Sequence, residues 1–356
     1  AGYLGSTGTR EVHVVTHRAW PDLEACPAIT VHAVRRPFGR HLLGSPLLAR
    51  AGRRLWDGLR PRGVKAIVNG GNCPVPCANW VHYLHAAYAP LMAGPLGRRA
   101  KSALTRRRDL AAERAALPKA RVVICNSRRT KEDVVRCLGI VDERVHVIYY
   151  GSDPIRFSRV DDQGRLAAKK ALGVSPERPL VGFVGALGDR RKAFDTVFAA
   201  FETLSGRRDW DADLMVVGSG AELPAWKARA RAAGLDGRIR FLGFRSDVPE
   251  LMAAFDAVVH PARYEAYGLS VHEALCRGIP ALVSASAGVA EHYPSSMADL
   301  LIHNPDDASE LAGRLVAWRH AMEAFRERVE PVSSALRART WDVMAREIVE
   351  CVERFA

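Results

Sequence analysis

The chain has 356 residues, enough for two domains of ordinary size, and no apolar run approaches the roughly 20 residues that a membrane-spanning helix needs. Its net charge of +13 fits two explanations equally: an Arg- and Ala-rich composition typical of a GC-rich bacterial genome, or attraction to anionic phosphates or an anionic membrane. The seven scattered cysteines indicate free thiols in a reducing compartment, so we expect a cytoplasmic protein.

Short β-branched runs alternate with amphipathic stretches along the whole chain. In the first half the expected strands are 11–17, 28–34, 65–70, 80–85, 120–127 and 145–151. In the second half they are 179–187, 212–220, 239–244, 256–262, 280–285 and 300–304, with helices expected at 195–205, 221–233 and 247–255. Strands that alternate with helices predict parallel sheets, here in two Rossmann-like halves with a break at 151–177.

The N-terminal half departs from that pattern. Its first expected strand begins near residue 11, after a Gly-, Ser- and Thr-rich lead with little apolar content. We therefore expect this half to lack the first strand of a Rossmann-like domain, which would expose a sheet edge.

Two glutamates, Glu265 and Glu273, stand with seven residues between them directly after the expected strand 256–262. Gly268 opens the helix that follows. The N–H groups at a helix start have no partner within the helix, and the helix dipole favours negative charge there. Strand, loop and helix start therefore predict a site for a phosphate-bearing ligand at the carboxyl end of a sheet.

Several blocks follow one another along the chain. They are ARVVICNSRRTKEDVV and VHVIYYGSDPIRF in the first half, and FVGALGDRRKAFDTVFAAF, LMVVGSGAELP, IRFLGFRSDVPELMAAFD and HPARYEAYGLSVHEALCRGIPALVS in the second. With these blocks, nearly the whole chain resembles the retaining glycosyltransferases of family 4, which have the α/β GT-B fold of two Rossmann-like domains facing a central cleft. The resemblance implies an acceptor-side domain at 1–165, a donor-binding domain at 166–334, and a C-terminal helix at 335–356 that packs back on the first domain.

The resemblance also implies roles for the segment between the two glutamates. Glu273 would bind the ribose hydroxyls of the nucleotide, and Glu265 would lie against the donor sugar as a catalytic residue. Backbone N–H groups for the diphosphate and the sugar would come from Tyr267, Gly268, Leu269 and Ser270.

Lys192 matches the phosphate-binding lysine of the family, and a cation there stabilises charge on the leaving diphosphate. The arginine that family members carry six residues earlier is Ala186 here, and the usual glycine after the lysine is Ala193. Arg190 or Arg191 would have to replace that arginine, and the sequence does not choose between them.

His85 resembles the histidine of the first domain that faces the donor sugar, and we expect it to be catalytic. His82 is its rival, because alternation along one regular strand puts the two on opposite faces. A structural role is equally compatible with either. Gly218 and Gly220 allow a tight strand-to-helix turn near the nucleotide.

The resemblance implies transfer of a sugar from a nucleoside-diphosphate-sugar donor to an acceptor hydroxyl with retention of configuration, in polysaccharide or glycolipid synthesis. It implies neither a metal nor another cofactor. The alternative is a catalytically impaired remnant that only binds nucleotide. Nothing in the sequence supports nucleic-acid binding. The basic stretch 98–114 would suit peripheral contact with an anionic membrane and a lipid-linked acceptor, or would simply be a solvated helix.

Overall fold

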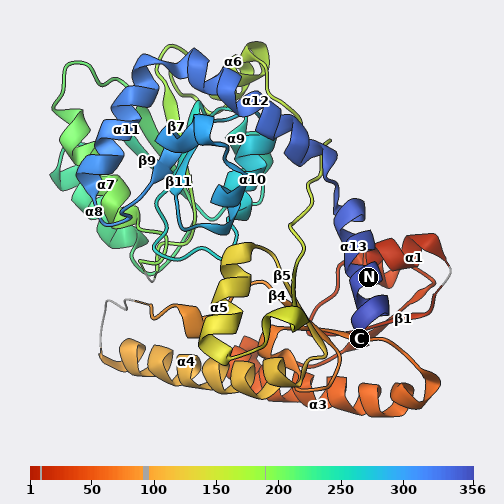
Figure 1. The fold of residues 1–356 in the computed structure, drawn as a ribbon. Coiled ribbons are helices and arrows are strands. Elements are labelled where there is room, and N and C mark those ends of the chain that lie inside the picture. Colours follow the sequence, from red (N-terminus) through yellow and green to blue (C-terminus); the bar gives the residue numbers. More distant parts are fainter. Residues whose placement is uncertain (9, 91–95, 189) are drawn as a thin grey trace. The chain divides into compact units, whose positions relative to one another are not determined.

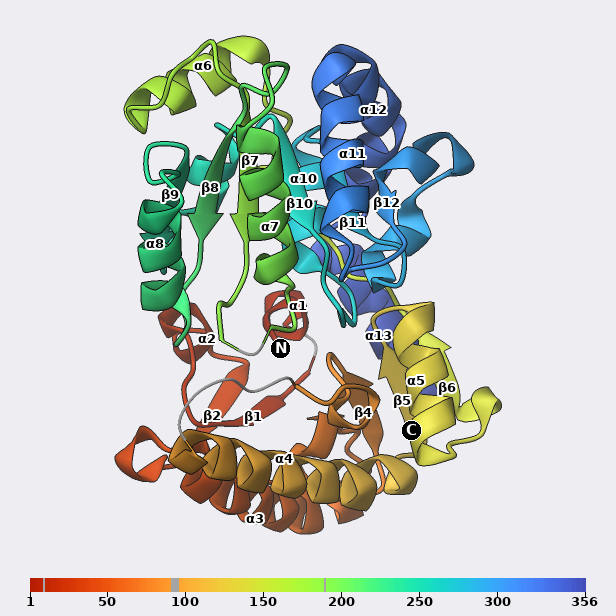
Figure 2. The same cartoon turned by 90° about the vertical axis from the view of Figure 1, so that its left-hand side faces the viewer.

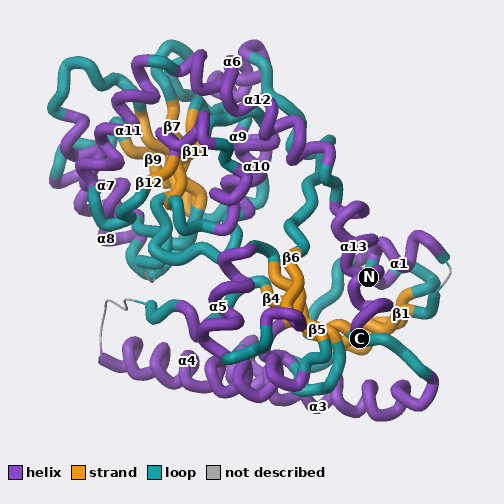
Figure 3. Tube along the Cα trace, in the orientation of Figure 1, coloured by secondary structure: helices purple, strands orange, loops and turns teal. Residues whose placement is uncertain are grey.

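The computed structural model describes residues 1–8, 10–90, 96–188 and 190–356, which form two compact units (Figure 1). The N-terminal unit takes in Ala1–Ala89, the described part of 95–149 and Asp342–Ala356. The C-terminal unit takes in Tyr150–Trp341. Each unit is an α/β layer structure, with its strands inside and its helices outside (Figure 3).

Elements of the N-terminal unit follow the alternation expected from the sequence. Its strands are β1 (Val12–Thr16), β2 (Ile29–Ala33), β3 (Ile67–Asn69), β4 (Ala78–Val81), β5 (Val122–Cys125) and β6 (Val145–Val147). Its helices are α1 (Gly2–Thr7), α2 (Pro21–Glu24), α3 (His41–Leu59), α4 (Leu96–Ala116), α5 (Arg128–Leu138) and α13 (Trp341–Phe355).

Local signals in the sequence explain where these helices begin and end. The Ser127 hydroxyl caps α5 by accepting from the Thr130 N–H at 3.0 Å, and Gly139 ends that helix in the left-handed conformation. Met344, Ile348 and Val352 lie at helical spacing on α13 and are buried.

The C-terminal unit contains the second series. Its strands are β7 (Leu180–Val184), β8 (Asp213–Val217), β9 (Ile239–Gly243), β10 (Ala257–His260), β11 (Ala281–Ser284) and β12 (Leu301–Ile302). Its helices are α6 (Asp162–Ala171), α7 (Phe194–Ser205), α8 (Leu223–Ala232), α9 (Val248–Met252), α10 (Leu269–Cys276), α11 (Ala308–His320) and α12 (Met322–Ala338).

The described strands of the C-terminal unit form one parallel sheet in the order β12-β11-β10-β7-β8-β9. From β7 the chain builds outward through β8 and β9, then returns to β10 on the other side of β7 and builds outward again. The pair β7 and β10 is therefore the topological switch point, where open α/β sheets form ligand sites beyond their carboxyl ends. The loops that follow β7 and β10 carry Lys192 and Glu265.

The strands of the N-terminal unit do not make one sheet. β1 pairs in parallel with β2, while β3, β4, β5 and β6 pair in parallel as a separate sheet. Figure 2 shows β1 and β2 standing apart from β4 and β5.

Three boundaries differ from the sequence-based expectation. The strand expected at 80–85 is β4, which ends at Val81. The units divide at Tyr149 and Tyr150, because α6 is held in the C-terminal unit by the buried Arg165 and Lys169, whose charged groups lie 3.6 and 2.7 Å from the Asp256 carboxylate. A boundary at 165 would cut through α6.

The terminal helical stretch is interrupted at Arg339 and Thr340 instead of running on from 335. There the Ser152 N–H donates to the Arg339 carbonyl at 2.8 Å, and the Trp341 N–H donates to the Ser152 carbonyl at 3.2 Å. These bonds draw the chain out of helical geometry and separate α12 from α13.

Candidate active site

A buried cluster of three side chains lies at the switch point of the C-terminal sheet. The Lys192 ammonium contacts Glu265 Oε2 directly, and His260 Nε2 lies 2.9 Å from the same oxygen. His260 Nε2 is also 3.3 Å from Lys192 Nζ. Lys192 comes from the loop after β7, His260 ends β10, and Glu265 stands in the loop after β10, so the topology itself assembles the cluster.

Burial and charge act in opposite directions on this cluster. Burial raises the pKa of Glu265, but the Lys192 ammonium, His260 and Arg191 outweigh it and hold that pKa well below its usual range. For His260, burial and then the neighbouring ammonium lower the pKa, so the ring is neutral. A neutral ring that donates from Nε2 to the Glu265 carboxylate keeps that carboxylate ionised in a largely closed pocket.

The two neighbouring arginines take different directions. Arg191 places its guanidinium 3.9 Å from Glu265 Oε2 and 3.3 Å from the Tyr264 carbonyl. Arg190 has a left-handed backbone and instead lies 3.7 Å from Glu222. Of the alternatives left open by the sequence, the structure brings Arg191 to the cluster and turns Arg190 away from it.

The loop into α10 has the geometry of an anion site. Gly268 caps the helix with φ +110°, and a Cβ there would come 3.0 Å from Val289. Among the described residues, none accepts a hydrogen bond from the backbone N–H of Gly268, Leu269 or Ser270. These groups are the polar donors that a phosphate at a helix start uses.

Tyr267 has a different place from its three neighbours. Its side chain is buried, and its hydroxyl lies 2.7 Å from His272 Nδ1 and 3.2 Å from His292 Nε2. Its carbonyl accepts from the Val289 N–H at 2.7 Å. The Tyr267 ring therefore anchors the loop against the protein, and only its backbone is left for the role expected from the sequence.

Glu273 lies one turn into α10, partly buried, and no hydrogen bond or ion pair to its carboxylate is found within the described ranges. Burial raises the pKa of this carboxyl to about 7, against a weaker opposing effect from Arg156 and Arg277. A carboxylate kept partly dehydrated and without a partner gains most from a ligand that brings hydroxyl donors.

Gly218 contributes through backbone packing. A Cβ at this position would lie 1.9 Å from the Gly185 carbonyl oxygen, and φ is +146°. The absence of a side chain lets the turn after β8 lie against the loop after β7, where the Leu187 N–H donates to the Ser219 carbonyl at 3.0 Å. Gly218 thereby supports the loop that carries Lys192.

His85 lies in the N-terminal unit, four residues beyond the end of β4, where it begins a 3-10 turn (His85–Ala87). Strand alternation therefore does not decide between His82 and His85. The buried Glu113 carboxylate accepts from the backbone N–H groups of His85 and Ala86 at 2.7 and 3.1 Å, and Asp109 lies 4.0 Å from His85 Nδ1. Burial raises the pKa of Glu113 to about 7.

Two residues of these clusters escaped the sequence analysis. His260 lies within the strand expected at 256–262, and a histidine at the end of a buried strand, five residues before a candidate glutamate, is itself a signal. Glu113 lies in the basic stretch 98–114, and nothing in the sequence near it points to the distant His85.

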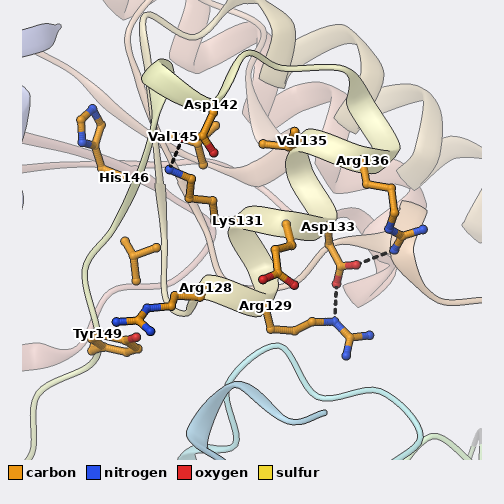
Figure 4. A pocket seen from close by; sticks show the side chains of 12 residues that line it. Arg128, Arg129, Lys131, Asp133, Val135, Arg136, Asp142, Val145, His146 and Tyr149 are labelled. Atoms are coloured by element: carbon orange, nitrogen blue, oxygen red, sulfur yellow. Dashed lines mark hydrogen bonds and ion pairs between the residues drawn. The ribbon is translucent and has the colours of Figure 1, made fainter. Parts of the chain in front are cut away.

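The N-terminal unit also contains an open pocket of about 990 Å³ lined by α5 and β6 (Figure 4). Figure 4 shows Arg129 and Arg136 turned toward Asp133, at 3.1 and 2.5 Å, and Lys131 turned toward Asp142, at 2.8 Å. These cations are already neutralised by acids of the same pocket, which makes it a weaker anion site than the start of α10.

Over the part of the chain that the structure describes, no group of three or more His, Cys, Asp or Glu side chains is arranged to hold a metal ion. None of the described helices is long and apolar enough to cross a membrane.

Comparison with known families covers both units. Residues 8–156 match the family described as Glycosyltransferase Family 4, and residues 178–319 match the family described as Glycosyl transferases group 1.

Individual relatives match in part. The chain is 33% identical to the 2-deoxystreptamine N-acetyl-D-glucosaminyltransferase of Streptomyces fradiae over 56% of this chain and 47% of the relative. It is 33% identical to the lipopolysaccharide core biosynthesis mannosyltransferase LpsB of Rhizobium meliloti over 39% of this chain and 40% of the relative. The chain thus spans about half the length of these curated relatives.

Solved structures match over nearly the whole chain. WaaG, a glycosyltransferase involved in lipopolysaccharide biosynthesis, has a TM-score of 0.72 at 20% identity, covering 98% of this chain and 93% of its own. HepE from Anabaena, in complex with UDP and glucose, has a TM-score of 0.71 at 19% identity, covering 99% and 94%. The likeness shows the GT-B fold, and with the two family matches it establishes that this chain belongs to the family 4, group 1 glycosyltransferases.

Proposed function

We propose that this protein is a retaining glycosyltransferase that moves a sugar from a nucleoside-diphosphate-sugar donor to an acceptor hydroxyl. The observation that carries the proposal is the switch point of the C-terminal sheet. There, the ammonium of Lys192 and the N–H groups of Gly268, Leu269 and Ser270 lie on the two loops that follow β7 and β10.

Each group has a task that suits its chemistry. Lys192 and the N–H groups at the start of α10 bind the diphosphate and stabilise the charge it gains when the bond to the sugar breaks. Arg191 adds a second cation in place of the arginine missing at Ala186. Glu273 accepts hydrogen bonds from the two ribose hydroxyls, for which its carboxylate has free acceptor sites.

Glu265 is assigned to the donor sugar. Its ionised oxygen faces partial positive charge at the anomeric carbon as the transition state takes on oxocarbenium character. The bond from the anomeric carbon to the diphosphate breaks, and the bond to the acceptor oxygen forms on the same face. The acceptor proton passes to an oxygen of the leaving phosphate, which needs no second carboxylate, and His85 is assigned to a hydroxyl of the donor sugar.

Uridine nucleotides are the first donors to test, because the similar HepE structures hold UDP, UDP with glucose, and UDP-glucose. The physical features above do not depend on the base. They bind the diphosphate, the ribose and the sugar, so guanosine and adenosine nucleotides belong in the same panel.

The acceptor is assigned to a saccharide or a lipid-linked saccharide. Support comes from α4, whose exposed Arg99, Lys101 and Arg107 are accompanied by the exposed Leu104. Such a surface attracts anionic phospholipid headgroups at the inner face of a membrane. Binding to phosphatidylglycerol vesicles but not to phosphatidylcholine vesicles, lost at high salt, tests this contact.

A second candidate is a protein that binds nucleotide and transfers nothing. One ground is that Lys192, the expected phosphate-binding cation, is already paired with the Glu265 carboxylate. The other is Ala186, which stands where family members carry an arginine.

One assay separates the two candidates. The protein is incubated with UDP-, GDP- and ADP-sugars, with and without a panel of saccharide acceptors, and both released nucleoside diphosphate and glycosylated product are measured. Acceptor-dependent release and a product of unchanged anomeric configuration by NMR support transfer. Saturable nucleotide binding without acceptor-dependent release for any donor supports the second candidate.

A further inference from the structure

His260 is the one member of the buried cluster to which the proposed function gives no task. Its side chain is fully buried at the end of β10. His260 pairs in register with Val283 of β11, and β10 pairs on its other side with β7. The sheet therefore holds the backbone of this histidine on both sides.

The surroundings of the His260 ring decide which of its two nitrogens carries the proton. Nε2 lies 2.9 Å from Glu265 Oε2, and an ionised oxygen attracts an N–H group and repels a lone pair. Nδ1 is buried and has no hydrogen-bond partner in the described part of the chain. A proton on Nδ1 would be a buried donor without an acceptor, which is costly. The neutral ring is therefore protonated at Nε2 and donates to Glu265.

Three described side chains surround the same oxygen of Glu265. The Lys192 ammonium contacts Oε2 directly, the Arg191 guanidinium lies 3.9 Å from it, and His260 donates to it at 2.9 Å. The proposed function assigns Lys192 and Arg191 to the diphosphate of the donor. Of these partners, only His260 is left to Glu265 alone.

A bound diphosphate competes with Glu265 for the two cations. A nucleoside-diphosphate sugar carries about two negative charges and the carboxylate carries one, so the diphosphate attracts a cation more strongly. The Lys192 ammonium can turn toward it, because it stands on a flexible four-carbon stem.

Glu265 then loses its closest cation in a place where its side chain is only 11% exposed. Burial raises the pKa of this carboxyl, and the raised pKa is no longer offset by the ammonium. A carboxyl that takes up a proton has no charge to offer the donor sugar. The donor complex therefore needs another group that keeps Glu265 ionised.

We infer that His260 is a positioning residue for sugar transfer, which holds Oε2 of Glu265 once the donor diphosphate has drawn Lys192 away. This inference rests on the proposed function, because it gives His260 a task at the same site. The Nε2–H group fixes one carboxylate oxygen. The other oxygen, Oε1, accepts a hydrogen bond from none of the described residues and is left for the donor sugar.

Two substitutions separate this task from packing in the core. The amide of glutamine reaches as far from the backbone as Nε2 does, so His260→Gln keeps a donor for Glu265. The amide of asparagine reaches only as far as Nδ1, where no described residue offers a partner. His260→Asn therefore keeps a neutral polar side chain but loses the bond to Glu265.

The wild-type chain and both variants are assayed at saturating donor and acceptor. The kcat of His260→Asn should fall at least about tenfold, as expected for the loss of a hydrogen bond to a charged group. The kcat of His260→Gln should stay within about threefold of the wild type. Calorimetry should give both variants a nucleoside-diphosphate Kd within about threefold of the wild type, because no contact of His260 with the nucleotide is assigned.

The pH profile of kcat is a readout that a loss of packing alone would not move. Transfer needs ionised Glu265, and the charged or titratable groups around it are Lys192, Arg191 and His260. Without the Nε2–H bond the pKa of the carboxyl rises in the donor complex. The acid-side fall of kcat should therefore begin about one pH unit higher in His260→Asn, a shift that corresponds to a tenfold change, and His260→Gln should keep the wild-type profile.

A double-mutant cycle with Glu265→Gln shows whether His260 acts through Glu265. In that background His260→Asn should change kcat by less than about twofold, because the charge that His260 holds is already absent. Equal losses in both backgrounds, or equal kcat values for His260→Gln and His260→Asn, would overturn the inference. Loss of nucleotide binding together with rate in both variants would also overturn it and assign His260 to folding.

These outcomes leave the proposed function standing, since the wild-type chain still transfers sugar in each of them. A wild-type chain that binds nucleotide but transfers no sugar to any acceptor would overturn the proposed function, and this inference with it.

Discussion

The sheets of the two units show what one missing neighbour does to a strand. In the C-terminal unit every residue of β10 and β11 is buried, and the described strands pair without interruption from β12 to β9. In the N-terminal unit β1 and β3 have comparable apolar sequences but remain partly exposed beside a cavity. Burial thus follows from the pairing partners, and apolar sequence alone does not secure it.

The two units also differ in how they hold the candidate site residues in place. In the Lys192–His260–Glu265 cluster, His260 ends β10, which pairs with β7, and the loops after these two strands bring Lys192 and Glu265 to its ring. His85 stands in a turn beyond the end of β4 and is held by two carboxylates of α4. We therefore expect changes in the C-terminal unit to have the larger and sharper effects.

Glu265→Gln gives the largest expected effect. The amide keeps the shape of the side chain but removes the charge that faces the sugar, so transfer should fall by about 10²- to 10³-fold. Nucleotide affinity should stay the same or rise, because Lys192 then has no competing carboxylate. Initial rates and calorimetric titration check this, with the exposed Glu202→Gln on α7 as the matched control. Equal loss of rate and of nucleotide binding would assign Glu265 to donor binding instead.

Gly218→Ala should lower the stability of the C-terminal unit. The added Cβ meets the Gly185 carbonyl at 1.9 Å in a backbone conformation that alanine avoids, a cost of about 3 kcal/mol. Urea unfolding followed by the tryptophans of this unit measures it. Gly313→Ala in α11, where a Cβ meets nothing within 4 Å, should instead stabilise by about 0.5–1 kcal/mol. Similar results for both substitutions would contradict the assigned loop packing.

Truncation of one valine in each sheet compares the two units directly. Val258→Ala removes fully buried methyl groups from β10 and should cost about 2 kcal/mol. Val14→Ala in β1 borders the cavity and should cost less than about 1 kcal/mol, because that side chain is only partly buried. If the two variants lose the same free energy of unfolding, the cavity beside β1 must be filled.

The pH dependence of nucleotide binding should follow the ionisation of the Glu273 carboxyl. With a pKa raised to about 7 by burial, its carboxyl is mostly protonated at pH 6 and mostly ionised at pH 8. The ionised form accepts stronger hydrogen bonds from ribose hydroxyls, so binding should tighten about three- to tenfold as the pH rises through this range. Glu273→Gln should bind more weakly at pH 8 and lose the pH dependence. A dependence that survives in this variant belongs to another group.

Ala193→Gly has the smallest expected effect, and it is favourable. Ala193 caps α7 with φ +50°, a left-handed conformation that costs a residue with a Cβ about 1 kcal/mol. Glycine should therefore raise the stability of the C-terminal unit by somewhat less than that, since it also gains freedom in the unfolded chain. Thermal unfolding measures the shift, and a fall in stability would show that the Ala193 side chain packs better than its backbone suggests.

Most of the architecture was predictable from the sequence. Strand positions from β1 to β12 followed from short apolar runs separated by helical periodicity. Glu265 and Glu273 were singled out by their place after an expected strand, and Lys192 by the resemblance to the family. The end of β4 was missed because it depends on Glu113, which lies far along the chain and accepts the N–H groups of His85 and Ala86. Local alternation contains no trace of such a contact.

The details of the site depended on three-dimensional contacts. The choice between Arg190 and Arg191 required the left-handed turn at Arg190, and the place of His260 required the pairing of β7 with β10. The expected absence of a first N-terminal strand came from composition, but the cavity between β1 and β3 could be described only once both sheets were known. The assigned roles of the site residues stay predictions.

Hydrogen exchange of the unmodified chain with and without UDP, GDP and ADP tests the central claim most directly. The account predicts that one of these nucleoside diphosphates slows exchange at residues 268–270 and around Lys192, at the two loops of the β7–β10 switch point. No protection by any of the three nucleotides, or protection confined to the pocket between α5 and β6, would contradict the assigned site.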